Sequence, residues 1–89
     1  MYYLYILKSE KSGKYYVGQT SNLEDRVLRH NSGKSISTRS GVPWILVFQR
    51  EYSTRSKAIL AEKWVKRMKS KKMIMDIIKE EIDLDRVVG

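Results

Sequence analysis

The chain has 89 residues, of which 42% are hydrophobic and 31% are charged, and its formal net charge is +8 at pH 7. This length allows one small domain, and a chain with no cysteine and a single histidine, His30, excludes disulfide frameworks, thiolate zinc sites and thiol enzymes. No apolar run approaches the roughly 20 residues of a membrane span, and the start does not resemble a signal peptide. We therefore expect a cytoplasmic protein, not bound to membranes, in which residues 1–89 form a single domain.

Two segments near the start of the chain predict a β-hairpin. Residues 1–8 (MYYLYILK) and 15–20 (YYVGQT) are rich in aromatic and branched side chains, and a polar loop separates them. If the turn is symmetric about residues 10–11, Tyr5 lies opposite Tyr16, whereas a loop of different length shifts this register.

A helix and a third strand are expected next. Residues 21–24 (Ser-Asn-Leu-Glu) match a capping box, in which Ser21 and the glutamate satisfy free amides at a helix start. The helix should run to about Asn31 and stop at Gly33. Residues 43–52 (PWILVFQREY) form a near-continuous apolar run that is too short for a typical helix, so they predict a strand.

The second half of the chain predicts two amphipathic helices. Thr54 is a suitable N-cap for the first, and the residues that recur at helical spacing and should face the core are Ala58, Ala61, Trp64, Val65 and Met68. The second, after the basic residues 69–72, is marked by Met73, Ile74, Ile77, Ile78 and Ile82. Trp44 and Trp64 are both expected in the core. The order ββαβαα predicts an α+β fold with a small three-stranded antiparallel sheet flanked by helices.

Positive charge is concentrated between residues 55 and 72. Against one acid, Glu62, this stretch holds eight basic residues: Arg55, Lys57, Lys63, Lys66, Arg67, Lys69, Lys71 and Lys72. A positive face on a small domain attracts polyanions, of which nucleic acid is the commonest. The alternative is a solvated helix surface that only keeps the protein in solution.

Two features indicate phosphodiester chemistry. Arg26 and His30 are four residues apart and share one helix face, so a guanidinium that binds phosphate lies near an imidazole that moves protons near neutral pH. Glu62 is a carboxylate among cations and suits Mg²⁺, which often uses one or two protein carboxylates. The alternatives are two solvated side chains on the helix and an i,i+4 salt bridge from Glu62 to Lys66.

Two short tyrosine motifs and an ordered set of residues carry a resemblance to a known family. The motifs are Leu4-Tyr5-Ile6 and Tyr16-Val17-Gly18, and the residues in order after them are Thr20, Leu23, Arg26, His30, Asn31, Gly33, Pro43, Trp44, Ala58, Glu62 and Lys66. Together they resemble the GIY-YIG endonuclease superfamily, specifically its small stand-alone bacterial members. Leu4 stands where the family has glycine and Val17 where it has isoleucine, and neither touches the proposed chemistry.

The resemblance implies metal-dependent hydrolysis of phosphodiester bonds in nucleic acid, which we expect to be DNA, with one divalent cation, Mg²⁺ or Mn²⁺. Tyr5 and Tyr16 would be the motif tyrosines, with Tyr5 or His30 serving as, or assisting, the general base. Arg26 would stabilise charge on the phosphate, and Glu62 would be the single protein ligand of the cation. Gly18 would keep the backbone close and the site open. The residues expected to bind nucleic acid are Lys14, Gly18, Lys63, Lys66 and Lys69.

Two other functions remain open at this stage. In family nucleases an attached domain or a partner protein commonly selects the target. The alternative function for this chain is therefore a nucleic-acid-binding module that is non-catalytic or depends on a partner. A third reading is an adaptor that binds a partner through the apolar stripe of residues 73–82, although a small domain needs that stripe for its core.

Overall fold

A three-stranded antiparallel sheet forms the centre of the molecule. The computed structural model describes residues 1–80 and 82–88. The strands are β1 (Tyr2–Ser9), β2 (Tyr15–Thr20) and β3 (Trp44–Tyr52), and their order in the sheet is β2-β1-β3. The α+β class and the three-stranded sheet predicted from the sequence are confirmed.

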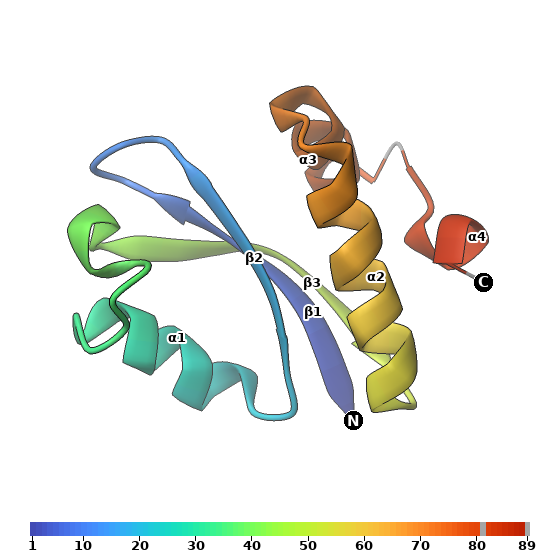
Figure 1. Ribbon diagram of the computed structural model, residues 1–89, viewed down its shortest axis with the longest axis horizontal. Helices are drawn as coiled ribbons and strands as arrows, with labels where there is room; N and C mark the ends of the chain where they lie inside the picture. The colour runs from blue at the N-terminus through green and yellow to red at the C-terminus, as the bar shows by residue number, and fades with distance from the viewer. Residues whose placement is uncertain (81, 89) are drawn as a thin grey trace.

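Helices cover both faces of this sheet (Figure 1). Helix α1 (Leu23–Asn31) packs on one face, and α2 (Arg55–Met68), followed by α3 (Lys71–Ile78), packs on the other. A short 3₁₀ helix, η1 (Arg39–Gly41), precedes β3, and a short helix, α4 (Leu84–Val88), follows α3. Among the described residues, no helix is long and apolar enough to cross a membrane.

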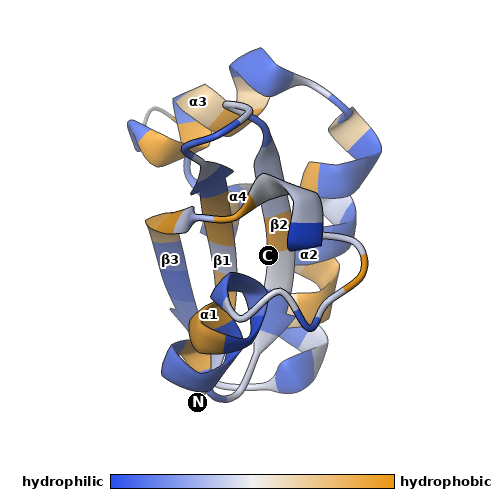
Figure 2. Ribbon diagram, turned by 90° about the vertical axis from the view of Figure 1, so that its left-hand side faces the viewer, coloured by the Kyte–Doolittle hydropathy of each residue, from blue (hydrophilic) through white to orange (hydrophobic). Residues whose placement is uncertain are grey.

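The central strand β1 is buried on both faces, which explains its uninterrupted apolar sequence. Leu4 and Ile6 point into the core beneath α2, whereas Tyr5 and Leu7 point into a second core beneath α1. Figure 2 shows hydrophobic colouring along β1 between the two helical layers. The side chain that carries the proposed chemistry, Tyr5, is therefore held inside the molecule.

The predicted hairpin register was wrong by two residues. Tyr5 lies opposite Gly18, and Tyr16 lies opposite Leu7. The reason is the loop, which is centred between Lys11 and Ser12 and closes with a hydrogen bond from the Ser9 amide to the Lys14 carbonyl. Because a shift of two keeps every side chain on its face, the two tyrosines still share the α1 side of the sheet.

Helix α1 begins one residue later than a cap at Ser21 requires, so that prediction was wrong. The Thr20 hydroxyl accepts a hydrogen bond from the Asn22 amide, and Asn22 then caps the helix by accepting from the Asp25 amide at 3.1 Å. The predicted end at Asn31 is confirmed.

Helix α2 confirms the predicted cap at Thr54 and most of the predicted core face. Ala58, Ala61 and Val65 are buried, and Trp64 is half-buried against them. Met68 was wrongly expected in the core, because it ends the helix and is 37% exposed.

The chain after α2 contains one helix more than predicted. Ser70 caps α3, which ends at Ile78, and Glu80 has a left-handed backbone conformation (φ 61°) that stops any extension to Ile82. Ile82 nevertheless packs against the core, and Leu84 at the start of α4 is buried. The apolar stripe of α3 thus belongs largely to the core, as its place in a small domain predicts.

Candidate active site

Tyr5 lies at the centre of the candidate site, and Gly18 makes room for its ring. The tyrosine is 1% exposed and crosses the neighbouring strand directly over Gly18. A Cβ atom at position 18 would stand 2.5 Å from the Tyr5 hydroxyl oxygen and 2.7 Å from Cζ, far closer than atoms pack. Gly18 therefore leaves the space that the ring of Tyr5 occupies, and its proposed role at the site stays a prediction.

His30, on the last turn of α1, meets the Tyr5 hydroxyl. The imidazole is 3% exposed, and its Nε2 atom lies 3.1 Å from the Tyr5 oxygen. Its other nitrogen, Nδ1, lies 2.8 Å from the hydroxyl oxygen of Thr38. The three side chains form one buried chain of hydrogen bonds that joins β1, α1 and the loop after α1.

Tyr16 completes the aromatic surroundings of this chain of hydrogen bonds. Its ring centroid lies 4.7 Å from that of His30 and 6.3 Å from that of Tyr5. It also meets the buried Trp44 edge-on at 6.4 Å. Tyr16 is half-buried, so it lies between the buried pair and the solvent.

The loop that carries Thr38 is tied down by four hydrogen bonds. Asn31 accepts from the Trp44 amide at 2.6 Å and donates to its carbonyl at 3.0 Å. The Trp44 indole donates to the Thr38 carbonyl at 2.8 Å, and Ser9 donates to the Gly41 carbonyl at 2.6 Å. Thr38 was missed from the sequence, because a threonine in a serine-rich loop carries no local signal of such a contact.

Charges around the buried pair set its protonation. Burial and the positive charge of Arg26 lower the pKa of His30 below its ordinary value, so the imidazole is neutral at physiological pH. The pKa of Tyr5 lies above its ordinary value, because burial, Tyr16 and the negative charge of Glu62 raise it more than Arg26 lowers it. Arg26 and Glu62 therefore both lie within electrostatic reach of Tyr5, and Arg26 also lies within reach of His30.

Glu62 lies on α2 and reaches this neighbourhood together with Lys66. The carboxylate forms an ion pair with Lys66 at 2.7 Å, which is the alternative that the sequence left open. The same Lys66 nitrogen stands 5.8 Å from the ring centre of Tyr16. The side chain of Glu62 is 22% exposed, so water and small ions can reach it.

This donor set fits one hard divalent cation and no closed metal cage. Within the described residues, no group of three or more histidine, cysteine, aspartate or glutamate side chains comes together. Mg²⁺ commonly keeps several waters and uses one or two carboxylates plus substrate phosphate oxygens. Glu62, partly open to solvent and held by a displaceable lysine, can supply that single carboxylate.

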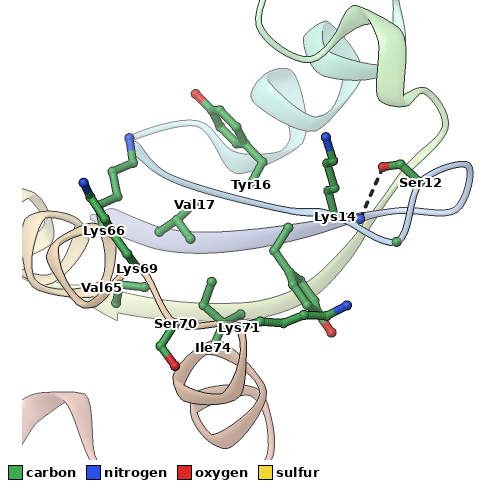
Figure 3. Close-up of a pocket in the computed structure, with 12 residues that line it drawn as sticks. Ser12, Lys14, Tyr16, Val17, Val65, Lys66, Lys69, Ser70, Lys71 and Ile74 are labelled. Carbon is green, nitrogen blue, oxygen red and sulfur yellow. Dashed lines mark hydrogen bonds between the residues drawn. The ribbon is translucent and has the colours of Figure 1, made fainter.

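A basic groove leads away from Tyr16 (Figure 3). It encloses about 480 Å³ between the hairpin loop and the junction of α2 and α3, and four of its lining residues are Lys14, Lys66, Lys69 and Lys71. Of the residues expected to bind nucleic acid, Lys14, Lys66 and Lys69 thus meet on one surface. Gly18 lies beneath Tyr5 instead, and Lys63 is exposed on α2 and does not line the groove.

Comparison with known proteins agrees with this fold. The family model described as the GIY-YIG catalytic domain matches residues 1–75. The chain belongs to this family, as its tyrosine motifs predict. Membership implies nuclease activity, binding of nucleic acid and use of a divalent metal in general terms.

The individual relatives are small bacterial proteins. The chain is 35% identical over 68 residues to a UPF0213 protein of Streptococcus pneumoniae, which covers 75% of this chain and 68% of the relative. It is 30% identical over 89 residues to the UPF0213 protein YsiG of Lactococcus lactis, covering 98% and 84% of the two chains. It also resembles the solution structure of a UPF0213 protein from Bacillus halodurans, with a TM-score of 0.57, 30% identity, and coverage of 89% and 84%.

Proposed function

We propose that the protein is an endonuclease that hydrolyses phosphodiester bonds of DNA with one divalent cation, Mg²⁺ or Mn²⁺, and that residues 1–89 act as one nuclease domain. The observation that carries the proposal is the buried contact of 3.1 Å between Tyr5 and His30, within reach of the charges of Arg26 and Glu62 in a GIY-YIG domain. A proton acceptor, a fixed cation and a carboxylate are the groups that an in-line attack of water on phosphorus requires.

The residues divide the work as follows. Tyr5 accepts a proton from the attacking water, and His30 holds the Tyr5 oxygen in place. Arg26 binds the non-bridging oxygens of the phosphate and favours the ionised form of Tyr5, against the burial that raises the pKa of this phenol. Tyr16 lies against His30 and shields the buried pair from bulk water.

Glu62 holds the cation in this proposal. When bound, a divalent cation neutralises charge on the phosphate and on the leaving oxygen. The Glu62 carboxylate would hold the cation once Lys66 releases it, and the Lys66 ammonium would then be free to contact the substrate. Both partners of the ion pair are partly exposed, so this exchange is cheap.

The lysines of the groove supply a path for the substrate backbone. Lys66 borders both Tyr16 and the groove, so a strand whose phosphate lies at Tyr5 continues past Lys69 and Lys14. Phosphate contacts of this kind provide most of the sequence-independent affinity for nucleic acid and make it depend on salt.

Hydrolysis is tested with labelled plasmid, single-stranded, branched and flap DNA and with RNA, each with Mg²⁺, Mn²⁺ or a chelator. We expect DNA to be cut in the presence of metal and Glu62→Gln to lower the rate about 10²-fold to 10³-fold. The matched control is Asp76→Asn, since Asp76 is also paired with a lysine four residues away and its side chain is 21% exposed, against 22% for Glu62. Equal loss in both variants, or cleavage that survives the chelator, contradicts the proposed role of Glu62.

A second candidate is a nucleic-acid-binding module that does not cut. The Glu62–Lys66 ion pair favours it, because a carboxylate already neutralised by lysine has less need of a metal. This candidate predicts that the wild-type protein shifts the mobility of nucleic acid in the gel but yields no cleavage product in any lane.

The groove is tested by the salt dependence of binding. We expect Lys69→Ala to reduce the slope of log K against log salt by about 0.9 for duplex DNA, the effect of one lost phosphate contact. Lys57→Ala is the control, because Lys57 lies twelve residues earlier, about 18 Å away along a helical rise, and does not line the groove. Equal slopes for the two variants exclude the groove as the path of the backbone.

A further inference from the structure

The basic groove has a charged rim and an apolar floor. The rim carries exposed lysines, which are Lys14, Lys66, Lys69 and Lys71. The floor is made of side chains that also pack against the core beneath α2, which are Tyr15, Val17, Val65 and Ile74. Among the described residues, no acidic side chain lines the groove. Figure 3 shows Val17 and Ile74 between Lys14 on the hairpin side and Lys66 on the α2 side.

Cations of the rim lie beside aromatic rings of the groove. The Lys71 ammonium stands 6.0 Å from the ring centre of Tyr15, and the Lys66 ammonium stands 5.8 Å from that of Tyr16. Lys8, opposite Tyr15 on β1, places a further ammonium 5.7 Å from the Tyr15 ring. An exposed contact between a cation and a ring is weaker than stacking of a nucleic-acid base on the ring, so a base can replace it.

The backbone of Lys69 gives an independent indication that its side chain is used. Lys69 follows the last turn of α2 in the left-handed conformation, with φ 47° and ψ 37°. Glycine is usual at this position because it has no Cβ atom, and a lysine there lowers stability. Such strain is typical of positions where the side chain serves a function. Here the strained residue places a cation on the rim of the groove.

The combination of rim and floor distinguishes between the polyanions that could bind. A duplex keeps its bases stacked and paired inside, so it meets the lysines of the rim and leaves the floor uncovered. An acidic peptide likewise meets the rim, but its carboxylates offer no flat ring to the floor. An unpaired nucleotide carries a phosphate and a flat base together, the pair of groups for which single-strand sites combine cations with aromatic side chains. The groove encloses about 480 Å³, within the range of about 300–1,000 Å³ for sites of small ligands.

We propose that the groove is a subsite for an unpaired nucleotide, whose base lies against Tyr15 while the adjoining phosphates lie at Lys69 and Lys71. The part that this subsite plays in cleavage rests on the proposed function, whereas the binding of an unpaired base does not. Lys66 borders both the groove and Tyr16, so the unpaired nucleotide lies next to the phosphate held at Tyr5. The substrate is then a strand that is unpaired beside the bond to be cut.

The subsite is tested by fluorescence anisotropy with a chelator present, so that no probe is cut. The labelled probes are oligothymidylate, oligouridylate, a DNA duplex of the same length, and an oligomer of abasic sugar-phosphate units. We expect the wild type to bind oligothymidylate about fivefold or more tighter than the abasic oligomer, the effect of a stacked base. Equal affinity for these two probes overturns the proposal. A comparison of oligothymidylate with oligouridylate then identifies the sugar that the subsite prefers.

Tyr15→Leu keeps an apolar side chain on the floor and removes the flat ring. It should weaken binding of oligothymidylate about fivefold or more and change the affinity for the duplex and the abasic oligomer little. Tyr2→Leu is the matched control, because Tyr2 also packs against the core with a cation, Arg55, 5.1 Å from its ring centre but does not line the groove. Equal losses in the two variants, or an equal loss for every probe in Tyr15→Leu, overturn the proposal.

Lys69→Gly tests the rim without the risk of a misfolded protein. Because the glycine relieves the strained backbone, this variant should unfold at a higher urea concentration than the wild type. It should nevertheless bind oligothymidylate about twofold to fivefold more weakly, the effect of one exposed ion pair. The control is Glu80→Gly, at an exposed position with φ 61° that does not line the groove, which should gain stability without losing affinity. Unchanged affinity in Lys69→Gly overturns the place given to the rim.

The outcomes for this inference and for the proposed function are distinct. Binding of oligothymidylate that depends on Tyr15, in a protein that cuts no substrate, supports the subsite and contradicts the proposed hydrolysis. Cleavage by a wild-type protein whose binding of oligothymidylate does not depend on Tyr15 overturns the subsite and leaves the nuclease intact. A polyglutamate peptide that displaces the probe as well as unlabelled oligothymidylate does also overturns the subsite, because charge alone then explains the binding.

Discussion

Replacing Gly18 by alanine is the sharpest test of how the sheet builds the site. The new Cβ would stand 2.5 Å from the Tyr5 hydroxyl oxygen, whereas an ordinary contact needs about 3.5 Å, so the ring must retreat by about 1 Å. Gly18 does not have a positive φ, so backbone strain plays no part. A displacement of this size moves the Tyr5 oxygen out of the position in which it contacts His30 at 3.1 Å.

The expected cost has two parts. Overpacking of this kind destabilises a fold by about 1–3 kcal/mol. A displacement of about 1 Å in a catalytic group costs on the order of 10²-fold in rate. Gly18→Ala should therefore lower both the free energy of unfolding and the rate of hydrolysis.

A double-mutant cycle with Tyr5→Leu isolates the clash. Urea unfolding followed by tryptophan fluorescence gives the free energy of unfolding for wild type, Gly18→Ala, Tyr5→Leu and the double variant. Once the ring is gone, the added methyl group should cost less than about 0.5 kcal/mol, so the coupling between the two positions is about 1–3 kcal/mol. Gly13→Ala is the control. Its left-handed backbone (φ 74°) makes alanine costly, but nothing lies within 4 Å of the added carbon, so its cost should be the same with and without the Tyr5 ring.

Equal destabilisation by Gly18→Ala with and without the Tyr5 ring would falsify this reasoning. So would a Gly18→Ala protein that unfolds and cuts like the wild type, because the ring would then have no need of the glycine.

Three further outcomes follow from the contacts of the site. Lys66→Ala should lower the Mg²⁺ concentration for half-maximal hydrolysis, because the Lys66 ammonium no longer competes with the cation for Glu62. The decrease should be up to about fivefold, which corresponds to an exposed ion pair of about 1 kcal/mol. A titration of the rate with Mg²⁺ in which the variant needs as much Mg²⁺ as the wild type, or more, argues against this. The pKa of His30 in the folded protein lies below its ordinary value, so the unfolded chain binds this proton more readily. The contribution of His30 to stability is therefore complete above about pH 6.5 and is lost as the pH falls below that value. Between about pH 7.5 and pH 5, the free energy of unfolding in urea should fall less for His30→Asn than for the wild type. Asn31→Ala leaves the amide and carbonyl of Trp44 without their partner and should lower the free energy of unfolding by about 2 kcal/mol in the same assay. A loss below about 0.5 kcal/mol would indicate that water replaces the two hydrogen bonds of Asn31.

Local patterns in the sequence were sufficient for most of the secondary structure. The aromatic and branched segments of the hairpin, the cap at Thr54 and the helical spacing of Ala58, Ala61 and Val65 are all present as predicted. These signals are reliable because they depend on neighbours within one or two turns of the chain. Errors occurred where one residue decides between adjacent geometries, as at the Asn22 cap and at Glu80 beyond α3.

The site was accessible from the sequence only as a set of residue types in a family order. Tyr5, Arg26, His30 and Glu62 come from three separate elements, and their order along the chain carried the resemblance without any distances. The predicted pairing of Tyr5 with Tyr16 was wrong because the register depends on how the hairpin loop closes, which composition does not encode.

The sequence by itself determined the class of fold, the family and the residues that we propose for the chemistry, because these follow from local periodicity and from short sequence motifs. Only the tertiary structure decided that Tyr5 lies over Gly18, that Thr38 meets His30 from a loop with no distinguishing sequence, and that Lys14, Lys66 and Lys69 share one groove. Those relations join segments far apart in the chain, and each depends on packing that no single segment specifies alone.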